Sequence, residues 1–190
     1  MDNMLPLTAV DMAARKSWAK GMLLRTDVGS IWDSIIFSDE KKWNLDGPDG
    51  FQHYWRDLRQ PARQTKRRQA GGGSVMVWAA FSARGKSPLV VLNGRQNLED
   101  YVRDFFNEEG IQMLDWPSKS PDLSPIENLL SIMSRQVYYN GKQLERVSDL
   151  ETALFDAWDA IPHDTLVSLV RSMPRRCVEV VEKEGNKTHY

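Results

Sequence analysis

Asp39 is the acidic side chain whose position in the sequence most favours chemistry. It follows the apolar run 35–37 in "IIFSDEKKW", so a strand would hold its carboxylate in a fixed direction. Carboxylate oxygens suit Mg²⁺ and Mn²⁺, which makes Asp39 a candidate ligand for a divalent metal. A water-exposed carboxylate at the end of a strand explains the same pattern, and on spacing alone it is the commoner case.

Glu127 is the second acidic candidate, and it has an equally plain structural explanation. In "SPIE", residues 124–127, serine stands at a cap position, proline at the first helical position and glutamate at the third. This arrangement is a capping box, which stabilises the start of a helix without any catalysis. The same pattern recurs as "SDLE" at 148–151, where it predicts a second capping box.

A third candidate is a basic stretch between two predicted strands. This stretch contains one acidic residue, Asp57, and six basic residues. The basic residues are Arg56, Arg59, Arg63, Lys66, Arg67 and Arg68. Such a density of positive charge, next to a glycine-rich hinge, could neutralise DNA phosphates. A solvated hairpin loop explains it equally well.

The composition favours a globular protein without disulfides, zinc sites or membrane spans. The chain has 190 residues, 41% of them hydrophobic, which suits one domain with a real core. Its net charge is -1, so any affinity for nucleic acid must come from a local patch. The single cysteine, Cys177, excludes an internal disulfide and favours a reducing compartment. The three histidines lack zinc-site spacing, and no apolar run approaches the length of a membrane span.

The first half of the sequence predicts one helix and then mainly strands. Apolar spacing indicates a helix over 8–24. The predicted strands are 35–45, ended by the turn signal "DGPDG", then 51–56 as its hairpin partner, 74–82 as a buried strand, and a short one in 87–94. An amphipathic helix over 97–110 and a strand over 111–116 follow, which suggests a crossover that adds a further strand.

The last third predicts only helices. They start at residue 126, with Leu129, Leu130, Met133 and Val137 inward, and at residue 148, with a second apolar stripe. Two shorter helices, 165–173 and 174–184, come next, and Gly185 is the expected stop. Strands, one crossover and then helices predict a mixed α/β domain.

Three stretches together closely resemble one protein family. They are "IIFSDEKKWNLDGPDGFQHYW", "GGGSVMVWAAFS" and "LDWPSKSPDLSPIENL", and the similarity runs from about residue 18 to 190. They resemble the DDE-type catalytic domain of mariner-superfamily transposases. The resemblance implies a ribonuclease-H-like fold and cut-and-paste DNA transposition, with three carboxylates holding two Mg²⁺ or Mn²⁺ ions. It identifies Asp39 with the first catalytic and metal-binding aspartate and Glu127 with the final glutamate.

The chain departs from the family pattern between these two residues. The family's second aspartate stands in a "QDNAP-H"-like segment on the fourth strand, roughly 34 residues before the glutamate. Here that count reaches residues 92–94, which carry no such motif. "NLEDYV" and "RDFFNEEGIQMLDWP" resemble family segments from either side of it, joined near Val102-Arg103 as if a stretch had been deleted. We therefore expect the fourth strand to be missing, and "IQMLD" at 111–115 to pair beside the strand of Asp39 instead.

Substitute ligands for the missing aspartate are few. The nearby acidic residues are Glu99, Asp100, Asp104 and Asp115. Asp115 is the best placed by its predicted strand, but "LDWP" belongs to the family pattern in its own right, so no new role is expected for it. With two ligands left, two-metal chemistry loses a bridging ligand and most of its rate.

These observations predict an N-terminal helical lead-in, residues 1–30, and an incomplete catalytic domain, residues 31–190. No helix-turn-helix DNA-recognition region fits before Trp18. We predict an intracellular, nuclear or cytoplasmic, transposase-derived domain that binds DNA weakly or without sequence preference through the basic stretch and is catalytically defective. A homodimer is compatible with this prediction and a membrane partner is not.

Two alternatives stay open. One is an active metal-dependent nuclease or strand transferase, which would use a substitute carboxylate or be a mis-predicted fragment of an intact transposase. The other is a core that does not close stably, with an exposed strand edge beside Asp39.

Overall fold

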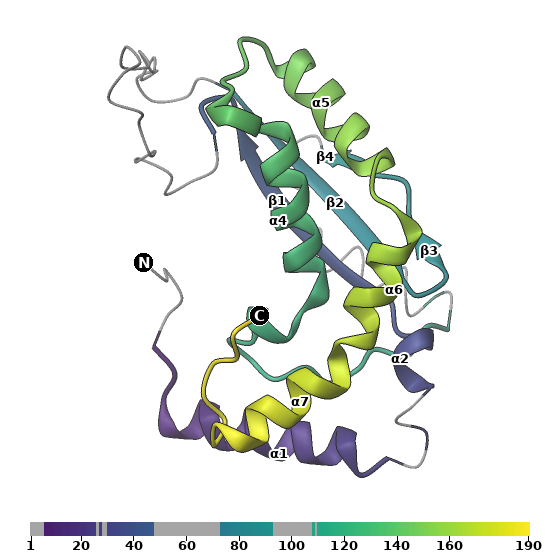
Figure 1. Cartoon of the computed structure of the whole chain (residues 1–190), viewed down its shortest axis with the longest axis vertical. Helices are drawn as coiled ribbons and strands as arrows, with labels where there is room; N and C mark the ends of the chain where they lie inside the picture. The colour runs from purple at the N-terminus through teal and green to yellow at the C-terminus, as the bar shows by residue number, and fades with distance from the viewer. Residues whose placement is uncertain (1–5, 26, 28–29, 48–72, 93–107, 109) are drawn as a thin grey trace. The chain divides into compact units, whose positions relative to one another are not determined.

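The computed structural model describes residues 6–25, 27, 30–47, 73–92, 108 and 110–190 (Figure 1). It divides into two compact units. The sheet unit comprises Asp33–Leu92 and Pro125–Val170, and the helical unit comprises Met1–Trp32, Asn93–Ser124 and Arg171–Tyr190. The predicted hairpin partner 51–56, the basic stretch, most of the helix 97–110 and the Val102-Arg103 junction lie outside the described residues.

The sheet unit is built on an antiparallel pair of strands. β1 (Phe37–Asn44) pairs with β2 (Ser74–Ser82), from Phe37 opposite Phe81 to Asn44 opposite Ser74. β3 (Gly85–Lys86) and β4 (Val90–Leu92) also pair with β2 and run antiparallel to it. The strands predicted at 35–45, 74–82 and 87–94 are confirmed, with shorter ends at the first and last.

Side chains alternate between the two faces of β1. Phe37 and Trp43 point to the same face as Asp39 and Lys41, because they are separated by even numbers of residues. Phe37 and Trp43 are buried, whereas the two charged residues between them are half-buried. The apolar ends of this row thus fix the direction of Asp39.

Two helices cover the sheet. α4 (Pro125–Val137) packs against β1, α5 (Val147–Asp159) packs against β2, and the two helices contact each other (Figure 1). The inward positions predicted for α4 are all buried. The start of α5 differs from the prediction: the helix begins at Val147 after Arg146, without a side-chain cap. Ser148 therefore lies inside the first turn, and the capping box predicted at 148–151 is wrong.

The hairpin of β2 and β3 is tied to the end of α5. The Lys86 ammonium donates to the carbonyls of Trp158, Asp159 (3.1 Å) and Ile161 (3.4 Å), and Trp158 Nε1 donates to the carbonyl of Ser87 (2.9 Å). A cation at a helix C-terminus is favourable because the last carbonyls lack helical partners. η2 (Tyr139–Gly141) links α4 to α5, and α6 (His163–Arg171) follows α5.

The helical unit is assembled around α1 (Ala9–Leu23) and α7 (Met173–Glu182), which lie side by side (Figure 1). Thr8 and Asp11 form a capping box at the start of α1, with Asp11 N donating to Thr8 Oγ1 and Thr8 N to Asp11 Oδ2. α2 (Ile31–Ser34) and η1 (Pro121–Leu123) are short. The predicted helices 8–24, 165–173 and 174–184 are confirmed with boundaries shifted by one to two residues.

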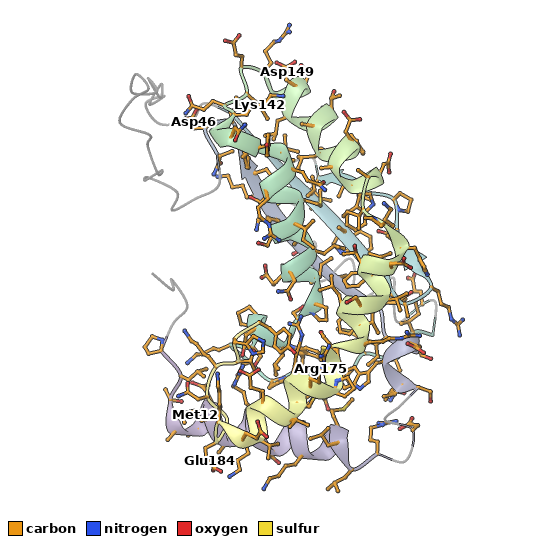
Figure 2. All side chains as sticks on the ribbon, viewed as in Figure 1. Met12, Asp46, Lys142, Asp149, Arg175 and Glu184 are labelled. Carbon is orange, nitrogen blue, oxygen red and sulfur yellow. The ribbon has the colours of Figure 1, made fainter. Side chains whose placement is uncertain are left out.

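Gly185 ends α7, as predicted, and its backbone explains why only glycine fits. Its φ is 87°, and its N–H donates to the carbonyl of Val180 (2.8 Å). A Cβ here would lie 1.9 Å from the carbonyl oxygen of Met12 in α1. Figure 2 shows Met12 and Glu184 at this meeting point of the two helices.

The strand predicted at 111–116 is wrong. Residues 111–117 have no regular secondary structure, so 111–115 does not pair beside β1. Trp18 Nε1 instead donates to the carbonyl of Asp115 (2.7 Å), and the rings of Trp18 and Trp116 are 4.8 Å apart. These contacts with α1 outweigh the β propensity of a short apolar run. Within the described part of the chain, β1 has one strand neighbour, β2.

Candidate metal centre

The sheet unit brings Asp39 and Glu127 together. Asp39 lies on the helix-covered face of β1, and Glu127 lies in the first turn of α4, which packs against that strand. Their carboxyl groups share a hydrogen bond. Two residues 88 positions apart in the sequence thus form one half-buried acidic pair.

Burial and proximity set the protonation of this pair. Burial raises the pKa of Asp39, opposed by hydrogen bonds from the Glu40 N–H (2.8 Å) and from Glu127. Burial also raises the pKa of Glu127, and the nearby Asp39 charge raises it further. The hydrogen bond between the two carboxyl groups lowers the pKa of Asp39 and raises that of Glu127, so of the two it favours proton release from Asp39. Both carboxyl groups therefore bind a proton more readily than an exposed carboxyl group does.

Lys41 is a charged neighbour of this pair that the sequence did not single out. Its charge lowers the pKa of both carboxyl groups. Its Nζ lies 5.5 Å from the centroid of the Trp43 ring on the same strand face. The signal was present in the sequence, because Lys41 follows Asp39 by two residues in a strand and so shares its face.

The donor set fits a divalent cation, although with few ligands. A cation could replace the shared proton and bind both carboxylates, since oxygen ligands suit Mg²⁺ and Mn²⁺. Across the residues that the structure describes, no group of three or more histidine, cysteine or acidic side chains could hold a metal. Two protein carboxylates therefore make up the described part of the centre.

The candidate substitute ligands do not add to this pair among the described residues. Asp115 is exposed, belongs to the helical unit and is not on a strand, so its predicted strand position is wrong. Glu99, Asp100 and Asp104 lie outside the described residues. The basic stretch with its six cations lies outside them as well, so its role in binding DNA stays a prediction.

Asp122, in the "SPDL" stretch before α4, is a carboxylate with a structural role. Its Oδ1 and Oδ2 accept hydrogen bonds from Arg15 (2.9 and 2.7 Å), and Oδ2 also accepts one from the Thr188 N–H (2.8 Å). Arg15 is fully buried. The sequence carried a signal for this pair, since Arg15 interrupts the apolar stripe of Met12, Ala19 and Met22 on α1.

Comparison with known proteins finds clear relatives, although no family model matches. The chain is 38% identical over 200 residues to the Tc3 transposase of Caenorhabditis elegans, covering 87% of this chain and 61% of the relative's length. It is 31% identical over 216 residues to the Tcb2 transposase of Caenorhabditis briggsae, covering 93% of this chain and 77% of the relative. The chain thus spans about three fifths of Tc3 transposase. Both alignments are longer than the 190 residues of this chain, so they contain gaps opposite segments of the relatives.

Solved structures share the fold. The catalytic domain of Mos1 mariner transposase matches with a TM-score of 0.73 at 15% identity, covering 98% of this chain and 99% of that domain. The Mos1 strand transfer complex matches with a TM-score of 0.80 at 18% identity, covering 100% of this chain and 66% of that one. The mixed α/β, ribonuclease-H-like fold predicted from the sequence is confirmed. Among the described helices, none combines the length and apolarity needed to cross a membrane.

Proposed function

Because the chain belongs to the Tc1/mariner family of transposases, we propose that it is a DNA-binding domain derived from a transposase whose metal centre is incomplete. It keeps Asp39 and Glu127 and has lost the second aspartate, so it does not catalyse transposition. The observation that carries this proposal is the hydrogen-bonded pair of Asp39 and Glu127 on β1 and α4.

Asp39 and Glu127 would hold a single divalent ion in this proposal. When bound, such an ion supplies activation of water or of a DNA 3′ hydroxyl and charge stabilisation at the transferred phosphoryl group. The chain's own residues prepare the site. The Glu40 N–H orients the Asp39 carboxylate, and partial burial of both carboxyl groups reduces their hydration. The pair must also give up its shared proton before it can take up a cation.

The lost aspartate is supported by the lengths of the alignments. The match to Tc3 transposase covers 87% of 190 residues, about 165, whereas it runs over 200 positions. About 35 of those positions therefore have no counterpart in this chain. A gap of this size agrees with a stretch deleted near Val102-Arg103, where two segments that are separate in the family stand side by side.

Nicking of supercoiled plasmid DNA tests the proposed defect. We expect the full chain with Mn²⁺ to give no more nicked product than its Asp39→Ala variant. Metal-dependent nicking that Asp39→Ala abolishes would overturn the proposal. It would favour instead an active nuclease or strand transferase that uses a substitute carboxylate.

Genomic DNA around the junction tests whether the deletion is real. An uninterrupted Val102-Arg103 codon pair is expected. An intact coding segment between the two codons, skipped as an intron, would make the chain a mis-predicted fragment of a complete transposase. The homodimer stays a prediction, which light scattering of the purified chain would check.

A further inference from the structure

Lys41 occupies a protected position beside the acidic pair. It follows Asp39 by two residues on the helix-covered face of β1, and in the strand register it stands opposite Val77, which is fully buried. The lysine itself is half-buried. Its stem therefore runs along an apolar wall, while its ammonium can reach the edge of the site.

The aromatic ring of Trp43 fixes the ammonium from one side. Lys41 Nζ lies 5.5 Å from the ring centroid, within the range of a cation–π interaction. Trp43 is only 2% exposed, and its ring centroid is 6.1 Å from that of Tyr138. The hydroxyl of Tyr138 in turn donates to the carbonyl of Asn44 (2.6 Å). The surface that holds the ammonium is thus rigid.

The donors of this ammonium are not used by the described part of the protein. No hydrogen bond and no ion pair within 4.0 Å joins Lys41 Nζ to a described residue. An ammonium carries three N–H donors, and a half-buried one has lost part of its hydration. Its positive charge nevertheless lowers the pKa of both Asp39 and Glu127, so the ammonium lies within electrostatic range of both carboxyl groups.

A DNA phosphate is the ligand whose chemistry fits this arrangement. A phosphodiester brought to two carboxyl groups is repelled by their negative charge unless a cation lies close to it. A fixed ammonium whose donors no described residue uses supplies both the opposite charge and the hydrogen bonds. We propose that Lys41 binds a backbone phosphate of DNA at the Asp39–Glu127 pair, an inference that rests on the proposed function.

The next residue offers a matched control. Lys42 carries the same charge one position along the strand, is exposed, and points to the opposite face of β1. Replacing either lysine by alanine removes one positive charge from the same strand. Only Lys41→Ala removes it from the site.

Salt-dependent binding of the full chain to a short fluorescent DNA duplex, measured by anisotropy in EDTA, tests the proposal. We expect Lys41→Ala to lower the slope of log K against log salt by about 0.9, the value for one phosphate contact. Binding at about 50 mM salt should then weaken about tenfold. Lys42→Ala should leave the slope unchanged, and Lys41→Arg should restore most of it.

The outcomes separate this inference from the function on which it rests. If the wild-type chain binds DNA and the slope of Lys41→Ala equals that of Lys42→Ala, the phosphate contact is refuted while the proposed DNA binding stands. A role limited to balancing the carboxyl groups would give that result, with a change only in Mn²⁺ affinity. If the wild-type chain does not bind DNA even at low salt, both proposals fail.

Discussion

Replacing Arg15 by methionine should severely destabilise the helical unit. The arginine is fully buried and donates to both carboxylate oxygens of Asp122, to Ser120 Oγ (2.6 Å) and to the carbonyl of Gly185 (2.9 Å). The variant keeps an unbranched side chain, shorter than that of arginine, but leaves the Asp122 carboxylate buried without its cation. Breaking a buried ion pair by removing one partner typically costs about 3–5 kcal/mol.

The upper part of that range is expected here. The Asp122 carboxylate accepts two hydrogen bonds from Arg15, and among the described residues Thr188 alone would remain as a donor to it. Burial raises the pKa of Asp122, but the hydrogen bonds from Arg15 and Thr188 outweigh it and lower the pKa below its ordinary value. A carboxyl group with a lowered folded pKa contributes stability above its unfolded pKa, which is about 3.9, and loses it as the pH falls through the folded value.

Urea unfolding followed by tryptophan fluorescence measures the effect, since Trp18 and Trp116 belong to the same unit. Lys16→Met is the matched control, because Lys16 is one residue away and pairs with a largely exposed Glu184. We expect the control to unfold like the wild type. A double variant, Arg15→Met with Asp122→Leu, should lose less stability than the sum of the two single changes. An Arg15→Met variant that loses less than about 1 kcal/mol would refute the reasoning.

Three further perturbations have expected outcomes. Gly185→Ala should destabilise the chain by about 2 kcal/mol or more in the same urea assay, because its Cβ would meet the Met12 carbonyl. The control is Gly21→Ala, which lies in a helix with open space around it and should not destabilise the chain. Equal effects of the two substitutions would contradict this account. The affinity of the chain for Mn²⁺, measured by calorimetry, should rise with pH, because burial raises the pKa of both Asp39 and Glu127 and the cation must displace a proton. An affinity that is independent of pH, or that Glu127→Gln leaves unchanged, would argue against the pair as the metal site. The double variant Arg67→Ala with Arg68→Ala should lose most of its DNA binding at low salt, measured by gel shift. Replacement of the exposed Arg146 by alanine is the control and should leave binding unchanged. Binding that the double variant retains in full would show that the basic stretch is not part of the DNA interface.

Local sequence patterns predicted most of the elements of this fold. The apolar residues of α4 all lie on one buried face of the helix, and the apolar run of β2 lies in the core. The sequence pattern of each element therefore predicted its secondary structure. The segment 111–116 failed because its apolar residues serve contacts with Trp18 of α1, and a partner so distant in the sequence leaves no mark on local spacing. The box at 148–151 failed because α5 starts at Val147, two residues earlier than a cap at Ser148 requires.

In the candidate site, too, local spacing predicted the elements but not the contacts between distant residues. Spacing alone placed Asp39 at a strand and Glu127 at a helix start, but it did not connect them across 88 residues. The resemblance to a family supplied that connection, and the packing of α4 on β1 agrees with it. Neither route indicated Lys41, whose importance depends on the ring of Trp43 and on the absence of closer partners among the described residues.

The contact between Arg15 and Gly185 has a consequence for biosynthesis. The two residues are 170 positions apart, and ribosomes add about 5–20 residues per second, so the carbonyl that receives Arg15 appears about 10–30 s after the arginine. Throughout that interval α1 exposes an apolar stripe interrupted by an unpaired cation. The sheet unit, whose last segment ends at Val170, can condense earlier. The buried contacts of the helical unit are therefore completed only when almost the whole chain has been synthesised.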